Sequence, residues 1–432
     1  MKIQNFILII LLILASCSIS SNVVKEPETE IEVYFCPEDS CLKEIIELSD
    51  SSQDIKCAFF DLDIPELIKA LKEKNAEVII EDKNALKDFS SGYSYALMHN
   101  KFCIFDKKII LTGSMNPTER GNYYNNNNIV IINSKHLAQN YIEEFEELSK
   151  NIYGKGKKVP NPVIFFGKKK IKNYFCPEDN CKLHVINELK KAEKSIYFMT
   201  YSFTDEDIGN LLFNKNYLGV DVKGILEKRQ ISTYSRYDDL KEFSIIDKNP
   251  YTMHHKVFII DNKTVITGSY NPTKNANENN DENILIIHDK TVADKFIEEF
   301  NHLLNIDYDI LPVETQEIVI SSVNYNPEGS DKDSEHIEVY NKGKYSVDLN
   351  YYFVSNNKTN MRLSGILLPE KNKKIYPSFS LRNKGEVLIL KKNLLPVDMV
   401  SWNLLWNLSA NEGQKLTRTN PDEINEDAWT IV

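Results

Sequence analysis

The chain has 432 residues, of which 42% are hydrophobic and 27% are charged. This is the composition of folded globular domains; it excludes a largely disordered or membrane-embedded protein, and the length predicts two or three domains. The net charge of −11 argues against a dedicated binder of long duplex DNA, because such binding depends mostly on neutralised phosphates. The lysine-rich stretch 155–173 is a local exception, and such a run is more often a solvated linker than a binding site.

The amino terminus has the pattern of an export signal. Lys2 precedes the apolar run FILIILLILA, which is too short to cross a bilayer comfortably and ends at LASC. A small-residue site directly before a cysteine resembles the lipobox of bacterial lipoproteins. This implies that 1–17 holds the signal peptide and lipobox, and that a lipid on Cys17 holds the exported protein on a cell membrane through a tether, 18–31. An ordinary secretory signal with an incidental cysteine is the alternative.

Six further cysteines fit an exported protein with disulfide bonds. The sequences YFCPEDSC and YFCPEDNC repeat one C-x4-C unit, so the simplest pairing is local. We therefore predict the disulfides Cys36–Cys41 and Cys176–Cys181. A zinc site is the competing interpretation, but the spacing is not C-x2-C and histidines are missing nearby. Cys57 and Cys103 lie in apolar strands, and we expect both to be buried thiols.

The sequence repeats one order of predicted elements. Each copy begins with an edge strand and the cysteine turn, then continues with a helix, an apolar strand, a second helix and another strand. A twenty-residue motif follows, and each copy closes with an Asn-rich loop, a strand and an acidic helix. Alternating strands and helices of this size indicate α/β layers. We place the halves at 32–153 and 173–308, with a linker over 154–172.

The second copy is longer than the first. The cysteine turns are 140 residues apart, whereas the motif histidines, His99 and His254, are 155 residues apart. We assign the fifteen additional residues to the region of RQISTYSRYDDLKEF, from Arg229 to Phe243. A loop of that length beside an active site is a natural place for substrate selectivity.

The twenty-residue motif carries the chemistry of the chain. Each copy reads His-x-Lys, four residues, Asp, six residues and Gly-Ser-x-Asn. A His and a Lys two apart on a strand point to one face, the Asp begins a turn, and the glycine lets the returning chain present Ser and Asn to the same face. The candidate site residues of the two copies are His99, Lys101, Asp106, Ser114 and Asn116, and His254, Lys256, Asp261, Ser269 and Asn271.

Such a face has the groups to bind and cleave a phosphodiester. Lysine gives a compact positive charge for a phosphate oxygen, and Ser and Asn add neutral donors. Histidine transfers protons near neutral pH and is also a nucleophile. Two faces brought together supply one His to attack phosphorus and one to protonate the leaving oxygen, while the other groups stabilise the developing charge. We expect no metal and no cofactor, because two lysines take the place of a metal ion.

The doubled motif resembles that of the phospholipase D superfamily, over about residues 34–304. The resemblance implies two α/β sandwich halves packed around a pseudo-two-fold axis and a covalent phosphohistidine intermediate. It implies that His99 and His254 are nucleophile and general acid/base, with family precedent slightly favouring His99 as the nucleophile. The motif lysines and asparagines would bind phosphate oxygens with help from the serines, and Asp106 and Asp261 would have a structural part. Because one chain holds both motifs, we expect a monomer.

The copies differ at one position that matters for catalysis. Family members often carry Glu-Asn eleven residues after the motif asparagine, with the glutamate orienting a histidine. The second copy has Glu282 followed by Asn283, whereas the first has Asn127 followed by Asn128. A carboxylate raises the basicity of a histidine, and an amide fixes the ring without adding charge, so we include Glu282 in the site and expect unequal histidines. A weakened first half is the alternative. His255, in the variable position of the second motif, should point to the opposite face and be structural.

After residue 316 the pattern changes to short alternating strands separated by turns, which predicts an all-β sandwich over 317–432. The stretches HIEVYNKG, VDLNYYFVS, LRNKGEVLIL and KLTRTNPDEINEDAWTIV resemble a lamin-tail domain, an immunoglobulin-like sandwich often appended to exported enzymes. The segment holds no catalytic constellation, and the partner that it would bind is unknown.

The leading hypothesis is a metal-independent phosphodiesterase that hydrolyses phospholipid head groups, because the family resemblance and the expected lipid anchor both favour a bilayer substrate. An endonuclease that cleaves DNA or RNA is the main alternative. The short copies and their TGS-x-NPT sequence resemble the compact endonuclease branch of the superfamily, whereas the acidic net charge weighs against it. A non-catalytic tether, whose sandwich binds a surface partner, is the third interpretation, and the intact paired histidines make it the weakest.

Overall fold

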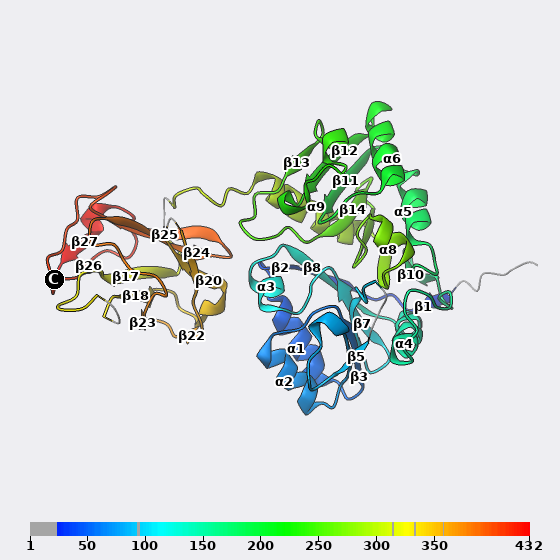
Figure 1. The fold of residues 1–432 in the computed structure, drawn as a ribbon, viewed down its shortest axis with the longest axis horizontal. Coiled ribbons are helices and arrows are strands. Elements are labelled where there is room, and N and C mark those ends of the chain that lie inside the picture. The colour runs from blue at the N-terminus through cyan, green and yellow to red at the C-terminus, as the bar shows by residue number, and fades with distance from the viewer. Residues whose placement is uncertain (1–23, 93–95, 313–314, 332–333, 357) are drawn as a thin grey trace, which may run out of the picture.

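The computed structural model describes residues 24–432, with the exception of 93–95, 313–314, 332–333 and 357 (Figure 1). The expected signal peptide and Cys17 lie outside the described residues. Two α/β halves lie side by side, and a unit built of strands lies at the left of the view (Figure 1). Within the described part of the chain, none of the helices has the length and apolar character needed to cross a bilayer.

The first half is a seven-stranded mixed sheet with the order β2-β8-β7-β6-β3-β4-β5. Its strands are β2 (Ile31–Cys36), β3 (Ile55–Phe59), β4 (Glu77–Glu81), β5 (Ser90–Gly92), β6 (Lys101–Phe105), β7 (Ile109–Gly113) and β8 (Asn127–Asn133). Its helices are α1 (Cys41–Ser51), α2 (Pro65–Glu73), the short 3-10 turn η1 (Asp82–Asn84), α3 (Glu119–Tyr123) and α4 (Lys135–Ser149). Strand β6 is buried along its whole length, which explains its continuous apolar sequence FCIF after the motif lysine.

The second half repeats this order as β10-β16-β15-β14-β11-β12-β13, and two further strands, β9 and β1, extend it beyond β10. The strands are β1 (Val24–Glu26), β9 (Val163–Phe166), β10 (Lys169–Cys176), β11 (Ser195–Thr200), β12 (Asp221–Leu226), β13 (Ser244–Ile246), β14 (Lys256–Ile260), β15 (Thr264–Gly268) and β16 (Glu282–His288). The helices are α5 (Cys181–Leu189), α6 (Glu206–Tyr217), η2 (Lys228–Gln230), α7 (Tyr237–Leu240), α8 (Lys274–Glu278) and α9 (Lys290–Asn305).

The segments expected as tether and linker take part in this sheet. Strand β1 lies within the expected tether and pairs in parallel with β9, which lies within the expected linker. Strand β9 in turn pairs with β10, so the cysteine turn of the second half does not follow an edge strand, unlike that of the first. Without β9, the backbone N–H and C=O groups on the outer side of β10 would be unpaired. The additional strands form because they satisfy these groups. Short helices α3 and α8 likewise occupy the expected Asn-rich loops.

One apolar core runs through both halves. Helix α4 of the first half packs against β10 of the second, and α9 of the second packs against β2 of the first. The ring centroids of Tyr141 on α4 and Phe175 on β10 are 5.0 Å apart, and Phe102 on β6 lies 4.9 Å from Tyr141. Because each closing helix packs both on its own sheet and on a strand of the other half, the relative orientation of the halves is fixed by core packing rather than by the linker.

Close backbone approach explains the glycine of each motif. Gly113 and Gly268 have φ values of 155° and 143°. A Cβ atom at Gly113 would lie 2.1 Å from the carbonyl oxygen of Asn128, and one at Gly268 would lie 2.3 Å from that of Asn283. Any larger residue would push β7 away from β8, or β15 from β16, so only glycine lets the chain leave the sheet there.

The described residues form three disulfides, and one of them corrects the sequence analysis. Cys36–Cys41 and Cys176–Cys181 are bonded as the C-x4-C spacing predicts. Cys57 and Cys103, expected to be free thiols, form the third disulfide. They are direct partners on the antiparallel strands β3 and β6, with Cα atoms 4.1 Å apart. The pairing of two strands 46 residues apart, which no local spacing reveals, brings the sulfur atoms together.

The third unit is all-β. A five-stranded sheet (β23-β18-β17-β26-β27) and a four-stranded sheet (β21-β20-β24-β25) enclose one apolar core, beside a small β19-β22 pair. The elements are β17 (Ile318–Asn324), β18 (His336–Asn341), β19 (Val347–Asp348), η3 (Leu349–Tyr351), β20 (Tyr352–Ser355), β21 (Asn360–Arg362), β22 (Ile366–Leu367), β23 (Asn372–Ile375), β24 (Glu386–Lys392), β25 (Leu395–Trp402), β26 (Leu416–Arg418), η4 (Glu426–Ala428) and β27 (Trp429–Ile431). The lamin-tail resemblance of this sandwich stays a prediction.

The disulfides should contribute unequally to stability. Removal of Cys57–Cys103 by a double Cys→Ala change is expected to lower the free energy of unfolding by about 4 kcal/mol, and removal of Cys36–Cys41 by about 2 kcal/mol, because a longer loop is constrained in the unfolded chain. Denaturant unfolding of the two variants measures the difference. Equal losses would show that loop length does not govern the contribution.

Candidate active site

The two motifs meet at the seam between the halves. The backbone N–H of His99 donates to the carbonyl oxygen of Asp281 at 2.9 Å, and the N–H of His254 donates to that of Asn126 at 2.8 Å. Each histidine is therefore hydrogen-bonded to the segment that enters β16 or β8 of the opposite half. This exchange brings both motifs to one place, and both histidines and both motif lysines are buried there.

Glu282 of the second half orients His99 of the first. Its Oε2 lies 2.8 Å from His99 Nδ1 and also accepts a hydrogen bond from Ser269 Oγ at 2.7 Å. Its Oε1 accepts from Asn280 Nδ2 at 3.1 Å. The carboxylate accepts hydrogen bonds, so it holds a proton on Nδ1 and leaves the lone pair on Nε2 of His99. Burial lowers the pKa of His99 to about 4 although Glu282 acts in the opposite direction, so the ring is neutral at pH 7.

Asn127 of the first half holds His254 of the second. Asn127 Oδ1 lies 2.9 Å from His254 Nδ1 and accepts from Ser114 Oγ at 3.1 Å. Asn127 Nδ2 donates to the carbonyl oxygen of Gly121 at 2.9 Å, which fixes which end of the amide faces the imidazole. His254 therefore also carries its proton on Nδ1. Asn127, which stands in the first half where the second half has Glu282, thus faces the histidine of the second half. An amide carries no charge that would raise the pKa of His254.

Four buried basic groups, two lysines and two histidines, characterise the site. Burial lowers the pKa of Lys101 to about 7 and lowers that of Lys256 well below its usual value. The pKa of His254 is also well below its usual value, first through burial and then through repulsion from Lys256, Lys101 and His99. Each lysine Nζ donates to the carbonyl oxygen of its own motif histidine, at 2.6 and 2.8 Å. These two lysines and two histidines disfavour one another's protonated forms. A bound anion stabilises the protonated forms and so raises all four pKa values, which makes the site a strong one for an anion.

The remaining motif residues divide into two groups. Asn116 has a buried Oδ1 without a hydrogen-bond partner among the described residues, which gives this amide spare capacity at the site. Asn271 Oδ1 accepts from the N–H of Ser202 at 3.3 Å. Asp106 and Asp261 lie at the far ends of β6 and β14, where each begins a three-residue turn, and accept backbone hydrogen bonds from the loops before β3 and β11. The aspartates hold the fold together away from the histidines.

Two aromatic residues of the site were missed from the sequence. The ring centroid of Phe60 is 5.1 Å from that of His99, and the ring of Tyr201 is 4.8 Å from that of His254. Each aromatic ring also lies 5.1 Å from the motif lysine of its own half, Lys101 or Lys256. Phe60 and Tyr201 each follow the apolar strand of their copy, in CAFF and FMTY. An alignment of the two copies places an aromatic residue at this position in both, and that match could have identified them from the sequence.

A second set of polar side chains lies behind the histidines. His255 is fully buried, with Nδ1 3.2 Å from Asn128 Oδ1 and Nε2 3.0 Å from Glu299 Oε1. In the matching place of the first half, Asn283 Nδ2 donates to Asn100 Oδ1 at 2.9 Å. The hydrogen bonds of His255 are thus made with residues other than those that hold His99 and His254, and through Asn128 this side chain connects the two halves.

The additional residues of the second half are distributed differently from the prediction. Glu81 and Glu227 are equivalent, because each accepts at 2.7 Å from the N–H of a motif methionine, Met98 or Met253. The separations are 17 and 26 residues, so nine of the fifteen lie in this interval and the others lie earlier in the copy. The interval nevertheless reaches the site, because Gln230 Nε2 donates to the Tyr201 hydroxyl at 3.0 Å.

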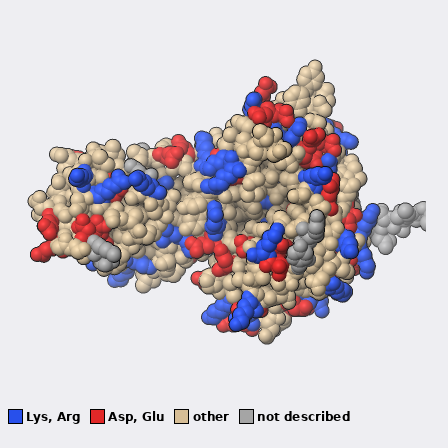
Figure 2. Space-filling model, viewed as in Figure 1, with Lys and Arg blue, Asp and Glu red and all other residues tan. Residues whose placement is uncertain are grey.

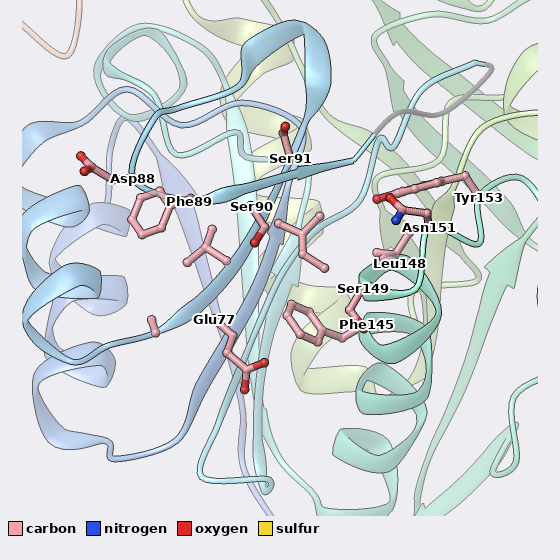
Figure 3. Close-up of a pocket in the computed structure, with 13 residues that line it drawn as sticks. Glu77, Asp88, Phe89, Ser90, Ser91, Phe145, Leu148, Ser149, Asn151 and Tyr153 are labelled. Carbon is pink, nitrogen blue, oxygen red and sulfur yellow. The ribbon is translucent and has the colours of Figure 1, made fainter.

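Other hollows and charged groups are less suited to a phosphodiester. A cavity of about 480 Å³ between β4, β5 and the end of α4 is lined in part by Glu77 and Asp88, which repel phosphate, and it contains no motif side chain (Figure 3). Glu144, Glu147 and Glu178 each place one oxygen within 4.8 Å of the others. Burial raises the pKa of Glu178 to about 7 and that of Glu144 well above its usual value. Acidic and basic side chains are interspersed over the face of the molecule in Figure 2.

Residues 26–149 and 185–304 match the family described as "Cardiolipin synthase, PLD-like domain". These two matches cover more than half of the chain, which belongs to the phospholipase D superfamily. It is a phosphodiesterase of that superfamily. The chain is 36% identical over 135 residues to the phospholipase D of Rickettsia conorii, covering 30% of this chain and 68% of the relative.

Two more distant matches extend the comparison, one in sequence and one in fold. The mitochondrial cardiolipin hydrolase of Homo sapiens is 30% identical over 123 residues, which cover 28% of this chain and 49% of the relative. The phosphatidylserine synthase of Haemophilus influenzae is 12% identical with a TM-score of 0.50, covering 63% of this chain and 86% of that structure. This last likeness shows a common fold for both halves taken together.

Inorganic phosphate should stabilise the folded protein through the motif lysines. At ten times its dissociation constant, phosphate is expected to raise Tm by about 3 °C above a chloride control of equal ionic strength, because the anion binds only the folded state. The rise should be lost in the double variant Lys101→Met, Lys256→Met. An equal rise in that variant, measured by differential scanning calorimetry, would contradict an anion site at the seam.

Proposed function

We propose that the protein is a metal-independent phosphodiesterase that hydrolyses the head-group phosphodiester of phospholipids through a phosphohistidine intermediate. One observation carries this proposal: each imidazole is held through Nδ1 by a side chain of the opposite half. Among the described residues, neither Nε2 takes part in a hydrogen bond, so both nitrogens are available to a ligand. A nucleophile and a proton donor on either side of one phosphate are what the two steps of this hydrolysis require.

His99 is the proposed nucleophile. Its ring is neutral at pH 7, and the Glu282 carboxylate stabilises the positive charge that the ring gains when Nε2 bonds to phosphorus. The phosphorus–nitrogen bond forms as the bond from phosphorus to the head-group oxygen breaks. His254 gives that oxygen a proton from Nε2, which it can carry once the phosphate charge has raised its pKa.

Water completes the reaction. His254, now neutral at Nε2, takes a proton from a water molecule, whose oxygen attacks phosphorus. The phosphorus–nitrogen bond breaks, phosphatidate leaves, and both histidines regain their starting states. Throughout, Lys101 and Lys256 stabilise the negative charge on the oxygens that do not react, in a buried site where such charge stabilisation is strongest.

The substrate class is proposed from two sources. Relatives that share about a third of aligned residues are called phospholipase D, and another is called cardiolipin hydrolase. The expected lipid on Cys17 would hold the site beside a bilayer, and both motifs lie in one chain, so the proposed working unit is a monomer at an exported membrane face. The net charge of −11 disfavours binding of an extended nucleic acid. The endonuclease is therefore the alternative outcome of the assay below rather than the leading proposal.

A direct assay decides between lipid and nucleic acid. Protein lacking residues 1–17 is offered phosphatidylcholine, cardiolipin and single-stranded DNA in EDTA. Release of phosphatidate or a head group without DNA cleavage is expected. DNA cleavage alone would replace the proposed lipid hydrolysis by endonuclease activity.

His99→Ala and His254→Ala should each lower kcat/KM by about 100-fold or more, because each removes a nucleophile or an acid–base group. Full activity in either variant would end the paired mechanism.

The two orienting side chains provide a test by exchange. Asn127→Asp places a carboxylate beside His254 and should raise its pKa, because the carboxylate favours the charged ring. The first step needs protonated His254, so kcat falls as pH rises through that pKa, and the alkaline limb of the pH–rate profile should move to higher pH. Glu282→Gln should lower kcat by about 10- to 100-fold, because His99 loses the support of its charge. An unmoved alkaline limb in Asn127→Asp would contradict the assignment of His254 as the acid.

A further inference from the structure

The C-terminal sandwich packs against α3, the short helix that follows the first motif (Figure 1). The Arg362 guanidinium bonds Glu119 Oε1 through Nη2 at 3.0 Å and Nε at 3.2 Å, and it lies 4.0 Å from the centroid of the Tyr123 ring. Tyr351 packs on Tyr123 with ring centroids 5.3 Å apart. Two side chains of the sandwich, Phe353 and Leu394, belong to a second apolar core, which is separate from the one that the halves share and is formed mostly by the first half. The sandwich therefore contacts both ends of α3.

The same helix holds the amide that orients His254. Gly121, in the middle of α3, accepts through its carbonyl oxygen the shorter hydrogen bond from Asn127 Nδ2, at 2.9 Å; the second acceptor of that group, the carbonyl oxygen of Asn125, lies at 3.4 Å. A Cβ at Gly121 would lie 2.1 Å from the carbonyl oxygen of Asn116, so the helix also lies directly on the motif asparagine. A displacement of α3 by a few tenths of an ångström changes both contacts. One short helix thus connects the sandwich on one side to the catalytic amide on the other.

The chemistry of an amide explains why this position needs support and its counterpart does not. Both oxygens of Glu282 are acceptors, so either one suits His99 Nδ1. An amide has one acceptor and one donor end, and a rotated Asn127 would present N–H to His254 Nδ1 and move the imidazole proton to Nε2. Neutral His254 could then no longer take a proton from water through Nε2. Helix α8, the counterpart of α3, makes no such bond to Glu282, whose second oxygen accepts from Asn280.

We propose that the sandwich is a positioning domain of the active site, in which Arg362 holds α3 so that Gly121 fixes the amide of Asn127 and, through it, the tautomer of His254. The role of His254 in the reaction rests on the proposed function; the effect of Arg362 on the tautomer does not. Arg362 is a positioning residue, because it touches neither histidine.

The test compares Arg362→Ala with Arg382→Ala in the full chain without residues 1–17. Arg382 is the control for loss of an arginine from the sandwich: its side chain is 52% exposed, against 19% for Arg362, and its partner Glu386 lies in the same sandwich rather than on α3. Long-range proton–nitrogen NMR spectra report the tautomers of His254 and His99, and hydrogen exchange reports the amides of α3. Activity is read as kcat and KM on the lipid that the assay identifies.

Arg362→Ala should give a mixture of His254 tautomers, faster exchange in α3, and kcat lower by about 10-fold with KM within twofold, while His99 keeps its single tautomer. Arg382→Ala should match the unchanged protein, and Arg362→Lys should fall between the two, because lysine keeps the charge and loses the planar fork. Should Arg362→Ala not fold, Glu119→Gln removes the same ion pair from the other side and carries the same expectation.

An unchanged His254 tautomer in folded Arg362→Ala or Glu119→Gln would overturn the proposal. A changed tautomer in a protein that cleaves no phosphodiester would instead support the positioning role and reject the proposed function. Equal effects of Arg362→Ala and Arg382→Ala would show general destabilisation of the sandwich and would also overturn it.

Discussion

The account depends on one constraint: each motif imidazole is bound through Nδ1 by a side chain of the opposite half. This exchange ties proton position to the packing of the halves, because neither ring has its partner until the sheets meet. The common apolar core fixes the relative position of the two sheets, and each closing helix also contacts a strand of the other half. Stability and catalysis therefore share one seam, and a change that loosens the core is expected to disturb the histidines before it unfolds either sheet.

The pseudo-symmetry is broken at the two side chains that orient the histidines. His99 faces a carboxylate, which stabilises a positive charge on that ring, and His254 faces an amide, which adds no charge. The division matches a nucleophile and an acid–base group. It also creates a structural demand on the amide side only, since an amide must be held the right way round, and the sandwich contacts the helix on that side.

Much of this was readable from the sequence, for physical reasons that also set the limit. The repeat, the layers and the motif face follow from local periodicity, so the sequence already named the side chains that meet at the seam; their roles in a reaction stay a prediction, as does the structural part expected for the aspartates. The Cys57–Cys103 disulfide was not found, because it depends on the pairing of β3 with β6. Nor did the sequence show that Glu282 serves His99 rather than the histidine of its own half. The strands β1 and β9, in the expected tether and linker, depend on an open sheet edge that the sequence does not show. The additional residues of the second half could be located only once the structure showed that Glu81 and Glu227 are equivalent.

The central claim is that both imidazoles serve one phosphate. The most direct measurement is a titration of the full chain without residues 1–17 with inorganic phosphate, followed by calorimetry and by the imidazole nitrogen resonances of His99 and His254. One phosphate per chain, with both sets of resonances moving at the same dissociation constant, is the predicted result. Two phosphates per chain, or histidines that respond with separate dissociation constants, would contradict a shared site at the seam.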